Sequence, residues 1–96
     1  MNNNFQQESL FNAISDVQRR KIIHLLKAGE MSVAQIKEHF ELSGATLSHH
    51  LSILKKADLV RVTRKGQQRI YTLNMTVAEE LILFINQLFR GNDNEK

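Results

Sequence analysis

The sequence predicts a mainly α fold with about five helices and one small β-hairpin, for three reasons. Apolar residues recur at helical spacing near both ends of the chain and in its middle. Residues 60–74 change to the two-residue alternation that is typical of paired β-strands. Residues 32–57 contain two helical patterns separated by a very short turn, which is typical of a helix-turn-helix. Together these patterns predict a winged helix-turn-helix, in which the hairpin is a two-stranded wing.

The composition is that of an ordinary globular domain, with 42% hydrophobic and 24% charged residues. A chain of 96 residues makes one domain, residues 1–96, and buries only about 65% of its unfolded surface, so a second copy would add stability. Cysteine is absent, which excludes disulfides and thiolate metal sites. The polar N-terminus lacks a signal-peptide pattern, and no apolar run reaches the roughly 20 residues of a membrane span. We therefore expect a cytoplasmic protein with no membrane insertion.

Two amphipathic helices are expected before residue 30. The first covers residues 5–15, and its apolar face consists of Phe5, Leu10, Phe11 and Ile14. Asp16 is a good N-cap for the second helix, which runs through RRKIIHLLKA and carries a wide face of isoleucine and leucine. Gly29 stands where a helix commonly ends in a left-handed residue.

The next two helices form the expected helix-turn-helix. Ser32 and Gln35 have the capping-box spacing at the start of a third helix, AQIKEHF. Glu41 and Leu42 alone separate this helix from Ser43, the expected N-cap of a fourth helix with the sequence GATLSHHLSILKKA. Two helices joined by so short a turn must cross sharply.

The fourth helix has two faces with different chemistry. Leu47, Leu51 and Leu54 share one apolar stripe. The opposite side is small, polar and weakly basic, and consists of Ala45, Ser48, His49, Ser52 and Lys56. Such a face lets the backbone come close to a DNA major groove, where serine and histidine can meet base edges and phosphates. A polar face that simply contacts water is the simpler alternative.

Residues 60–74 are expected to form a β-hairpin centred on Lys65-Gly66, because β-branched and aromatic residues alternate on both sides of it. The tip is cationic and polar, with Arg64, Lys65, Gln67, Gln68 and Arg69. A basic hairpin beside a helix-turn-helix is a wing, positioned to contact phosphates or the minor groove. An exposed hairpin kept soluble by charge is the alternative.

The net charge of +3 is unevenly distributed. Between Ser43 and Asn74, Asp58 is the single acid, against six lysine and arginine residues. One face of the domain is therefore expected to be positive, which suits duplex DNA. A winged-helix protein-interaction module, whose basic face binds an acidic protein, is the alternative function.

The last helix is expected at residues 76–90, with Thr76 and Glu79 in capping-box spacing and Gly91 at its end. Ile82 and Phe89 widen its apolar stripe, so the helix needs a cover from the first helix, a second copy of the chain, or both. We expect a two-fold homodimer built from the two terminal helices, because a palindromic DNA site is read by a symmetric pair. The expected interface residues are Phe5, Leu10, Phe11, Ile14, Val77, Leu81, Phe84, Ile85 and Leu88. Residues 92–96 are expected to be a disordered tail.

Much of the chain, from about Phe11 to Phe89, resembles the winged-helix repressors of the ArsR/SmtB type. Their opening helices are similar to AISDVQRRKIIHLL, although Val17 stands where a proline is usual. Their DNA-binding core is similar to MSVAQIKEHFELSGATLSHHLSILKKADLVRVTRKGQQRIYTLN, where the positions in family register include Ser48, His50, Leu51, Leu54, Leu59, Val60, Gly66 and Tyr71. The short form without proline most resembles the sporulation-delaying-protein autorepressor subgroup.

The resemblance implies which residues contact DNA. Base contacts are implied for Gly44, Ala45, Ser48 and His49, and phosphate contacts for Thr46 and Ser52. The whole expected set also includes Ser43 at the start of this helix and, in the wing, Arg61, Arg64, Lys65, Gln67, Gln68 and Arg69. Gly44 and Ala45 depart from the larger polar residues often found there, so readout is expected to depend on Ser48, His49 and DNA shape. His50 lies about 60° from the leucine stripe, which favours packing and a local hydrogen bond.

Enzyme, metal and cofactor sites are not expected. No nucleophile is paired with a base and no glycine-rich loop could hold a phosphate. Metal-sensing relatives carry cysteines on the third helix or Asp and His pairs on the last, and this chain has neither. His24 and His39 are isolated, and the adjacent His49 and His50 diverge by about 100° on a helix. The resemblance implies instead a dimer that represses an operon from an inverted repeat and is released by an inducer. A small molecule between the dimer helices and a partner protein are both open as that inducer, and activation is open as the sign of control.

Overall fold

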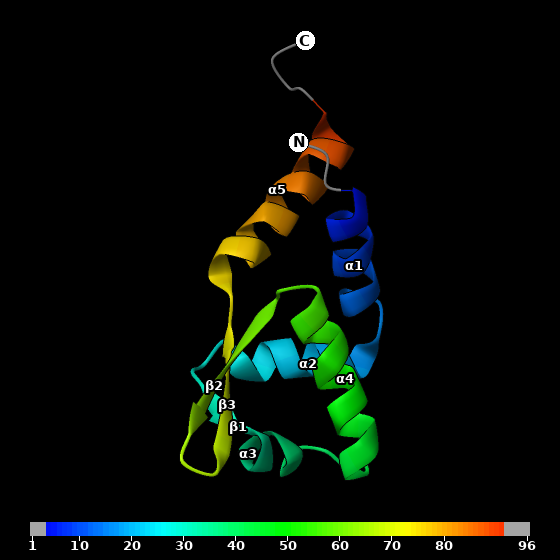
Figure 1. The fold of residues 1–96 in the computed structure, drawn as a ribbon. Helices are drawn as coiled ribbons and strands as arrows, with labels where there is room; N and C mark the ends of the chain where they lie inside the picture. Colours follow the sequence, from blue (N-terminus) through cyan, green and yellow to red (C-terminus); the bar gives the residue numbers. More distant parts are fainter. Residues whose placement is uncertain (1–3, 92–96) are drawn as a thin grey trace.

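The computed structural model describes the backbone of residues 4–91 and the side chains of residues 6–91. It contains five helices and three strands within this range (Figure 1), namely α1 (Asn4–Ile14), α2 (Val17–Leu26), β1 (Met31–Ser32), α3 (Val33–Lys37), α4 (Gly44–Lys56), β2 (Val60–Lys65), β3 (Gln68–Leu73) and α5 (Met75–Arg90). The predicted mainly α fold with a hairpin wing is confirmed. The Phe5 side chain and the tail expected at residues 92–96 lie outside the described residues. Within residues 4–91, every helix is too short or too polar to span a lipid bilayer.

The sheet has three antiparallel strands in the order β1-β3-β2, not the two that the sequence predicts. The hairpin β2–β3 pairs Val62 with Tyr71 and Val60 with Leu73, so its two-residue loop is Gly66-Gln67, one residue later than the predicted centre at Lys65-Gly66. β1 adds two residues to its other edge, where Met31 pairs with Tyr71. A strand of two residues is too short to show an alternating pattern in the sequence, so this pairing is defined by the tertiary fold.

Side-chain caps define where three of the helices begin, as predicted. The Asp16 carboxylate accepts hydrogen bonds from the backbone N–H groups of Gln18 and Arg19 at 2.7 and 3.2 Å. Ser32 and Gln35 form a complete capping box, with distances of 3.1 and 2.8 Å. Each cap satisfies N–H groups that have no partner inside the helix, which stabilises the helix start by about 1 kcal/mol for an ordinary serine or threonine cap.

Two predicted helix ends and one predicted capping box are wrong. α2 ends at Leu26 and α3 at Lys37, both earlier than the apolar pattern indicates, because the chain continues in tight turns. α5 begins at Met75 without the capping box predicted at Thr76 and Glu79. Its N-cap is Asn74, whose side-chain amide donates to the Asp58 carbonyl at 2.9 Å instead of capping the helix.

The core lies between α2, α3, α4 and the sheet. Its most buried side chains, all at 2% exposure or less, are Ile22, Ile36, Leu47, Leu54, Leu59 and Val60. Leu51 is buried as well, so the predicted leucine stripe of α4 faces inward and its polar side faces outward. The core therefore fixes which side of α4 a ligand can reach.

The molecule is elongated, with extents of 53 × 24 × 24 Å. Figure 1 shows α1 and α5 extending together from one end of the winged-helix body. Phe11 and Phe84 join the two helices through an edge-to-face ring contact with 5.7 Å between centroids. α1 thus supplies part of the cover that the apolar α5 requires.

We expect Leu54→Ala to lower the free energy of unfolding by about 2–5 kcal/mol, because it opens a cavity in the most buried part of the core. Urea denaturation followed by circular dichroism measures this loss. Val17→Ala is the matched control, since Val17 is 64% exposed and a surface change costs less than about 0.5 kcal/mol. An equal loss in the two variants would contradict this assignment of the core.

Candidate nucleic-acid interface

The predicted contact residues of α4 lie on its exposed side. Ser43, Gly44, Ala45, Thr46, Ser48, His49 and Ser52 are all exposed, in contrast to the leucine stripe. Because α4 is an amphipathic helix of 13 residues, this polar side forms one continuous strip along the surface.

The start of α4 is built by two hydroxyl groups. Ser43 Oγ accepts a hydrogen bond from the Thr46 backbone N–H at 3.1 Å and donates to Thr46 Oγ1 at 3.0 Å. The Ser43 hydroxyl therefore donates and accepts within the chain. The Thr46 hydroxyl only accepts within the chain, so its proton can be donated to a bound phosphate. This geometry suits a phosphate contact by Thr46 and a structural role for Ser43.

Gly44 and Ala45, the first two residues of α4, leave the exposed start of this helix almost without side chains. A Cβ atom built on Gly44 would meet no other atom within 4 Å, so the fold itself does not require glycine at this position. The absence of side-chain bulk lets the helix backbone come close to a ligand surface.

A groove joins α4 to the wing and the start of α3. This recognition groove has a volume of about 380 Å³, and it is lined by Ser32, Val33, Ala34, Gly44, Ser48, Gln67, Gln68 and Arg69. It brings together helix and wing residues that the sequence predicts separately. The groove also includes three residues that were not predicted as contacts, Ser32, Val33 and Ala34. The predicted cap at Ser32 does place them correctly at the start of α3.

The wing tip concentrates positive charge. Arg64 lies directly opposite Arg69 across the hairpin, and like charges in this position destabilise the pairing. A bound phosphate group would relieve this repulsion. The two-residue loop is formed by Gly66 and Gln67, and Gly66 has a φ of 61°, a conformation that favours glycine.

One wing cation has a partner in the free protein. Lys65 Nζ lies 3.2 Å from a carboxylate oxygen of Glu30, in the loop before β1, and both side chains are more than half exposed. The other polar side chains of the wing are also exposed, namely Arg61, Arg64, Gln67, Gln68 and Arg69. The ion pair connects the wing tip to the rest of the sheet and reduces the charge that Lys65 offers to a polyanion.

The predicted interface residues of the terminal helices divide into three groups. Leu10 and Leu81 are buried within the chain, and Leu88 is 62% exposed. The remaining described members are partly buried, namely Phe11, Ile14, Val77, Phe84 and Ile85. α5 also exposes Ile82, Leu83 and Phe89, of which the sequence analysis did not include Leu83.

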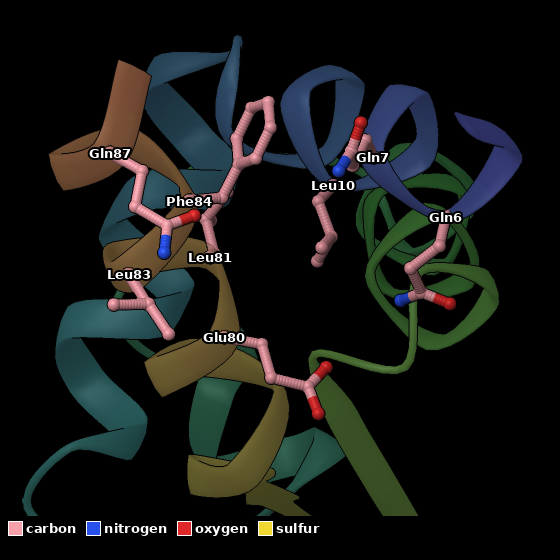
Figure 2. Close-up of a pocket in the computed structure, with 8 residues that line it drawn as sticks. All are labelled: Gln6, Gln7, Leu10, Glu80, Leu81, Leu83, Phe84 and Gln87. Carbon is pink, nitrogen blue, oxygen red and sulfur yellow. The ribbon is translucent and has the colours of Figure 1, made fainter. Parts of the chain in front are cut away.

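A pocket of about 220 Å³ lies between the two terminal helices. Figure 2 shows side chains from both helices around it: Gln6, Gln7 and Leu10 from α1 and Glu80, Leu81, Leu83, Phe84 and Gln87 from α5. A mixture of leucine, phenylalanine and amide groups suits an amphipathic small molecule or apolar side chains of another chain. In the part of the chain that the structure describes, no three histidine or acidic side chains are grouped to hold a metal ion.

Comparison with known proteins identifies close sequence relatives. A family model described as "bacterial regulatory protein, arsR family" matches residues 16–62, from the start of α2 into the wing. The chain is 45% identical over 87 residues to the transcriptional repressor SdpR of Bacillus subtilis, covering 91% of this chain and 97% of that protein. It is 32% identical to the arsenical resistance operon repressor of Staphylococcus aureus, covering 88% of this chain and 81% of that protein.

The fold is similar to solved structures of the same kind. HlyU from Vibrio cholerae matches with a TM-score of 0.73 and 30% identity, covering 93% of this chain and 98% of the other. HlyU is a transcriptional activator, and the two relatives above are repressors. All three are regulators of transcription, which confirms the expectation of a regulator that is not an enzyme and favours DNA binding over a protein-interaction module.

We expect Glu30→Gln to tighten binding to every DNA duplex by about two- to fivefold, because it frees Lys65 from an exposed ion pair. Fluorescence anisotropy on two unrelated duplexes measures the change. Glu79→Gln on α5 is the matched control, since it removes the same charge from an exposed site away from the wing. If the two variants bind DNA equally tightly, the Lys65–Glu30 pair has no role in binding.

Proposed function

Because the chain belongs to the arsR family of bacterial regulatory proteins, we propose that this DNA-binding transcriptional regulator is a dimeric repressor of its own or a neighbouring operon. Each protomer would place α4 in the major groove of one half of an inverted repeat. The wing would lie on the flanking backbone or minor groove.

The observation that carries this proposal is the recognition groove between α4 and the wing. The major groove of B-DNA, about 12 Å wide, admits one α-helix, and the small side chains of Gly44 and Ala45 allow close approach. Ser48 and His49 lie next along the exposed face, where their polar atoms can meet base edges. Gln67, Gln68 and Arg69 continue the same surface from the other side of the groove.

The positive surface around the groove supports binding to the phosphate backbone. Arg64 and Arg69 stand opposite each other at the wing tip, and Arg61 is exposed on the same strand as Arg64. Contacts of this kind give affinity without sequence preference, whereas contacts from α4 give selectivity.

Two relatives that cover most of the chain are repressors, which supports repression as the sign of control. HlyU is an activator of similar size and fold, so activation is the alternative outcome. The pocket between α1 and α5 has both apolar and amide groups, which makes it a candidate site for a small-molecule inducer.

The exposed apolar side of α5 supports a dimer. Ile82 and Phe89 are seven residues apart, on one side of the helix, and are 63% and 81% exposed. Met75 continues this stripe at 52% exposure. An apolar stripe on a protruding helix marks an interaction surface, and a second copy of α5 is a self-complementary cover for it.

We expect Phe89→Glu to weaken dimerisation by more than about tenfold, because burying a phenylalanine contributes about 1.5–3 kcal/mol and a two-fold interface buries it twice. Sedimentation velocity across micromolar concentrations measures the dissociation constant. Thr76→Glu introduces the same charge at an exposed position on the opposite side of α5 and should leave the dimer intact. A wild-type chain that sediments as a monomer at these concentrations would rule out the proposed assembly.

We expect wild-type protein to bind the DNA just upstream of its own gene selectively over scrambled duplex in fluorescence anisotropy at two salt concentrations. Arg64→Ala should weaken binding to both duplexes alike and reduce the slope of log affinity against log salt by about one. His49→Ala should cost more on the upstream DNA than on the scrambled duplex, because its contact is with bases.

The contrast between the two variants is the decisive control. If His49→Ala weakens binding to both duplexes equally, His49 does not read bases directly. Weak and unselective binding by the wild-type chain at both salt concentrations would contradict control of its own gene.

A further inference from the structure

A buried arginine on α2 connects two other helices. Arg19 is 6% exposed. Its Nε donates to the Ala13 carbonyl and its Nη2 to the Asn12 carbonyl, both at 2.9 Å. Its Nη1 lies 3.1 Å from Nδ1 of His50. The guanidinium therefore joins the last turn of α1 to the middle of α4, the helix that carries the recognition face.

The chemistry of this contact defines the protonation of His50. A guanidinium has donors and no acceptor, so Nδ1 of His50 must be the acceptor. The ring is then neutral, with its proton on Nε2. A proton added to Nδ1 removes the acceptor and places two positive charges about one hydrogen-bond length apart. His50 is 8% exposed, so little water is present to compensate.

The charged groups around His50 come from α2 and from the residue that caps it. Besides Arg19, the Asp16 carboxylate at the start of α2 interacts electrostatically with His50. Desolvation raises the pKa of Asp16, but hydrogen bonds from two backbone N–H groups and the charges of His50 and Arg19 outweigh it and hold the pKa below its ordinary value. Asp16 thus remains a carboxylate throughout the range in which histidines titrate. The Asp16 carboxylate attracts Arg19 and would attract a protonated His50. It already accepts hydrogen bonds from the backbone N–H groups of Gln18 and Arg19 at the start of α2.

The other neighbours bring no charge into contact with the ring. On α4, the His49 ring lies 6.0 Å from that of His50 and is exposed. α1 contributes the carbonyls of Asn12 and Ala13, which bind Arg19, and its acid Glu8 is exposed. The charged residues of β2 are also exposed. The direct contact with Arg19 therefore dominates the effect of protonating His50.

A second hydrogen bond ties the same two helices at another point. Gln6 Nε2 on α1 donates to the carbonyl of Ala57, the residue that ends α4, at 3.1 Å. α1 therefore holds α4 near its C-terminal end and, through Arg19, at its middle. In the dimer of the proposed function the interface lies on α5, which α1 contacts through Phe11 and Phe84, so these ties would connect that interface to the recognition helix of the same protomer.

We propose that Arg19 and His50 are positioning residues that hold α4 in its DNA-binding orientation while His50 is neutral, and that protonation of His50 releases α4. This inference rests on the proposed function. Specific binding requires that the distance between the two α4 helices of a dimer match the distance between the two half-sites of the DNA. Release of α4 should therefore weaken binding to the specific site more than binding to unrelated DNA. A proton added to Nδ1 of His50 removes the acceptor for Arg19 Nη1, so acidification is the change that breaks this contact.

The test compares wild type with His50→Asn, whose side-chain oxygen can accept from Arg19 and cannot be protonated in this range. Both are made in a His49→Asn background, because protonation of His49 would itself attract DNA. Anisotropy on the specific duplex is measured from pH 8 to pH 5.5. We expect the two chains to bind the duplex equally at pH 8. At pH 5.5, the chain that retains His50 should lose about tenfold or more in affinity, whereas the His50→Asn chain should not. Parallel pH profiles would overturn the proposal.

Arg19→Gln is the second variant. It removes the positive charge beside His50, so affinity should fall at pH 8 and the remaining pH dependence should disappear. A pH dependence equal to that of the parent chain would also overturn the proposal. Circular dichroism at both pH values verifies that each chain is folded.

Nuclear magnetic resonance of ¹⁵N-labelled wild-type protein separates this inference from the proposed function. At pH 8, the His50 ring should show an unprotonated Nδ1 and a proton on Nε2, and acidification should shift the amide signals of Asn12 and Ala13. A proton on Nδ1 at pH 8 would overturn the inference whether or not the protein binds DNA. Failure of every duplex to bind at pH 8, with the predicted ring tautomer present, would contradict the proposed function instead.

Discussion

Burial of the leucine stripe on α4 is the constraint on which the rest of the structure depends. Leu47, Leu51 and Leu54 are 0–2% exposed and pack with Ile22 of α2 and Ile36 of α3. Each such side chain contributes about 1.5–3 kcal/mol when removed from water, so α4 cannot rotate without losing much of the stability of a small domain. The burial of this apolar stripe therefore holds the polar side of α4 outward, beside the wing.

The sequence was sufficient for features that depend on neighbouring residues. Asp16, Ser32 and Ser43 cap helices within three residues of themselves, and the strands of the wing are adjacent in the chain. Features that join distant segments could not be predicted in the same way. β1 pairs with β3 across about 40 residues, and the Lys65–Glu30 pair spans 35. The N-cap of α5 was also wrongly predicted, since it is Asn74, whose side chain binds the carbonyl of Asp58, 16 residues earlier in the chain.

α1 has two roles that involve different sides of one short helix. Phe11 contacts α5 through the edge-to-face pair that it forms with Phe84. Gln6 and the last carbonyls of α1 hold α4, directly and through Arg19. A movement of α1 would thus reach α4 through these hydrogen bonds and also through the core, in which Leu10 and Ala13 of α1 are buried with the leucines of α4. The position of His50 could be predicted from its angle on the helix, but its partner 31 residues away could not.

The open space in front of Gly44 has a consequence for the divergence of regulators built on this fold. Any side chain placed there would point outward without meeting another atom of the chain within 4 Å at its Cβ, and the backbone there needs no positive φ. A single substitution at position 44 could therefore add a side chain to the exposed start of α4, and with it a possible base contact, without repacking the domain. Duplicated copies of such a gene could separate their target sites at this position first, while the shared core keeps both proteins folded.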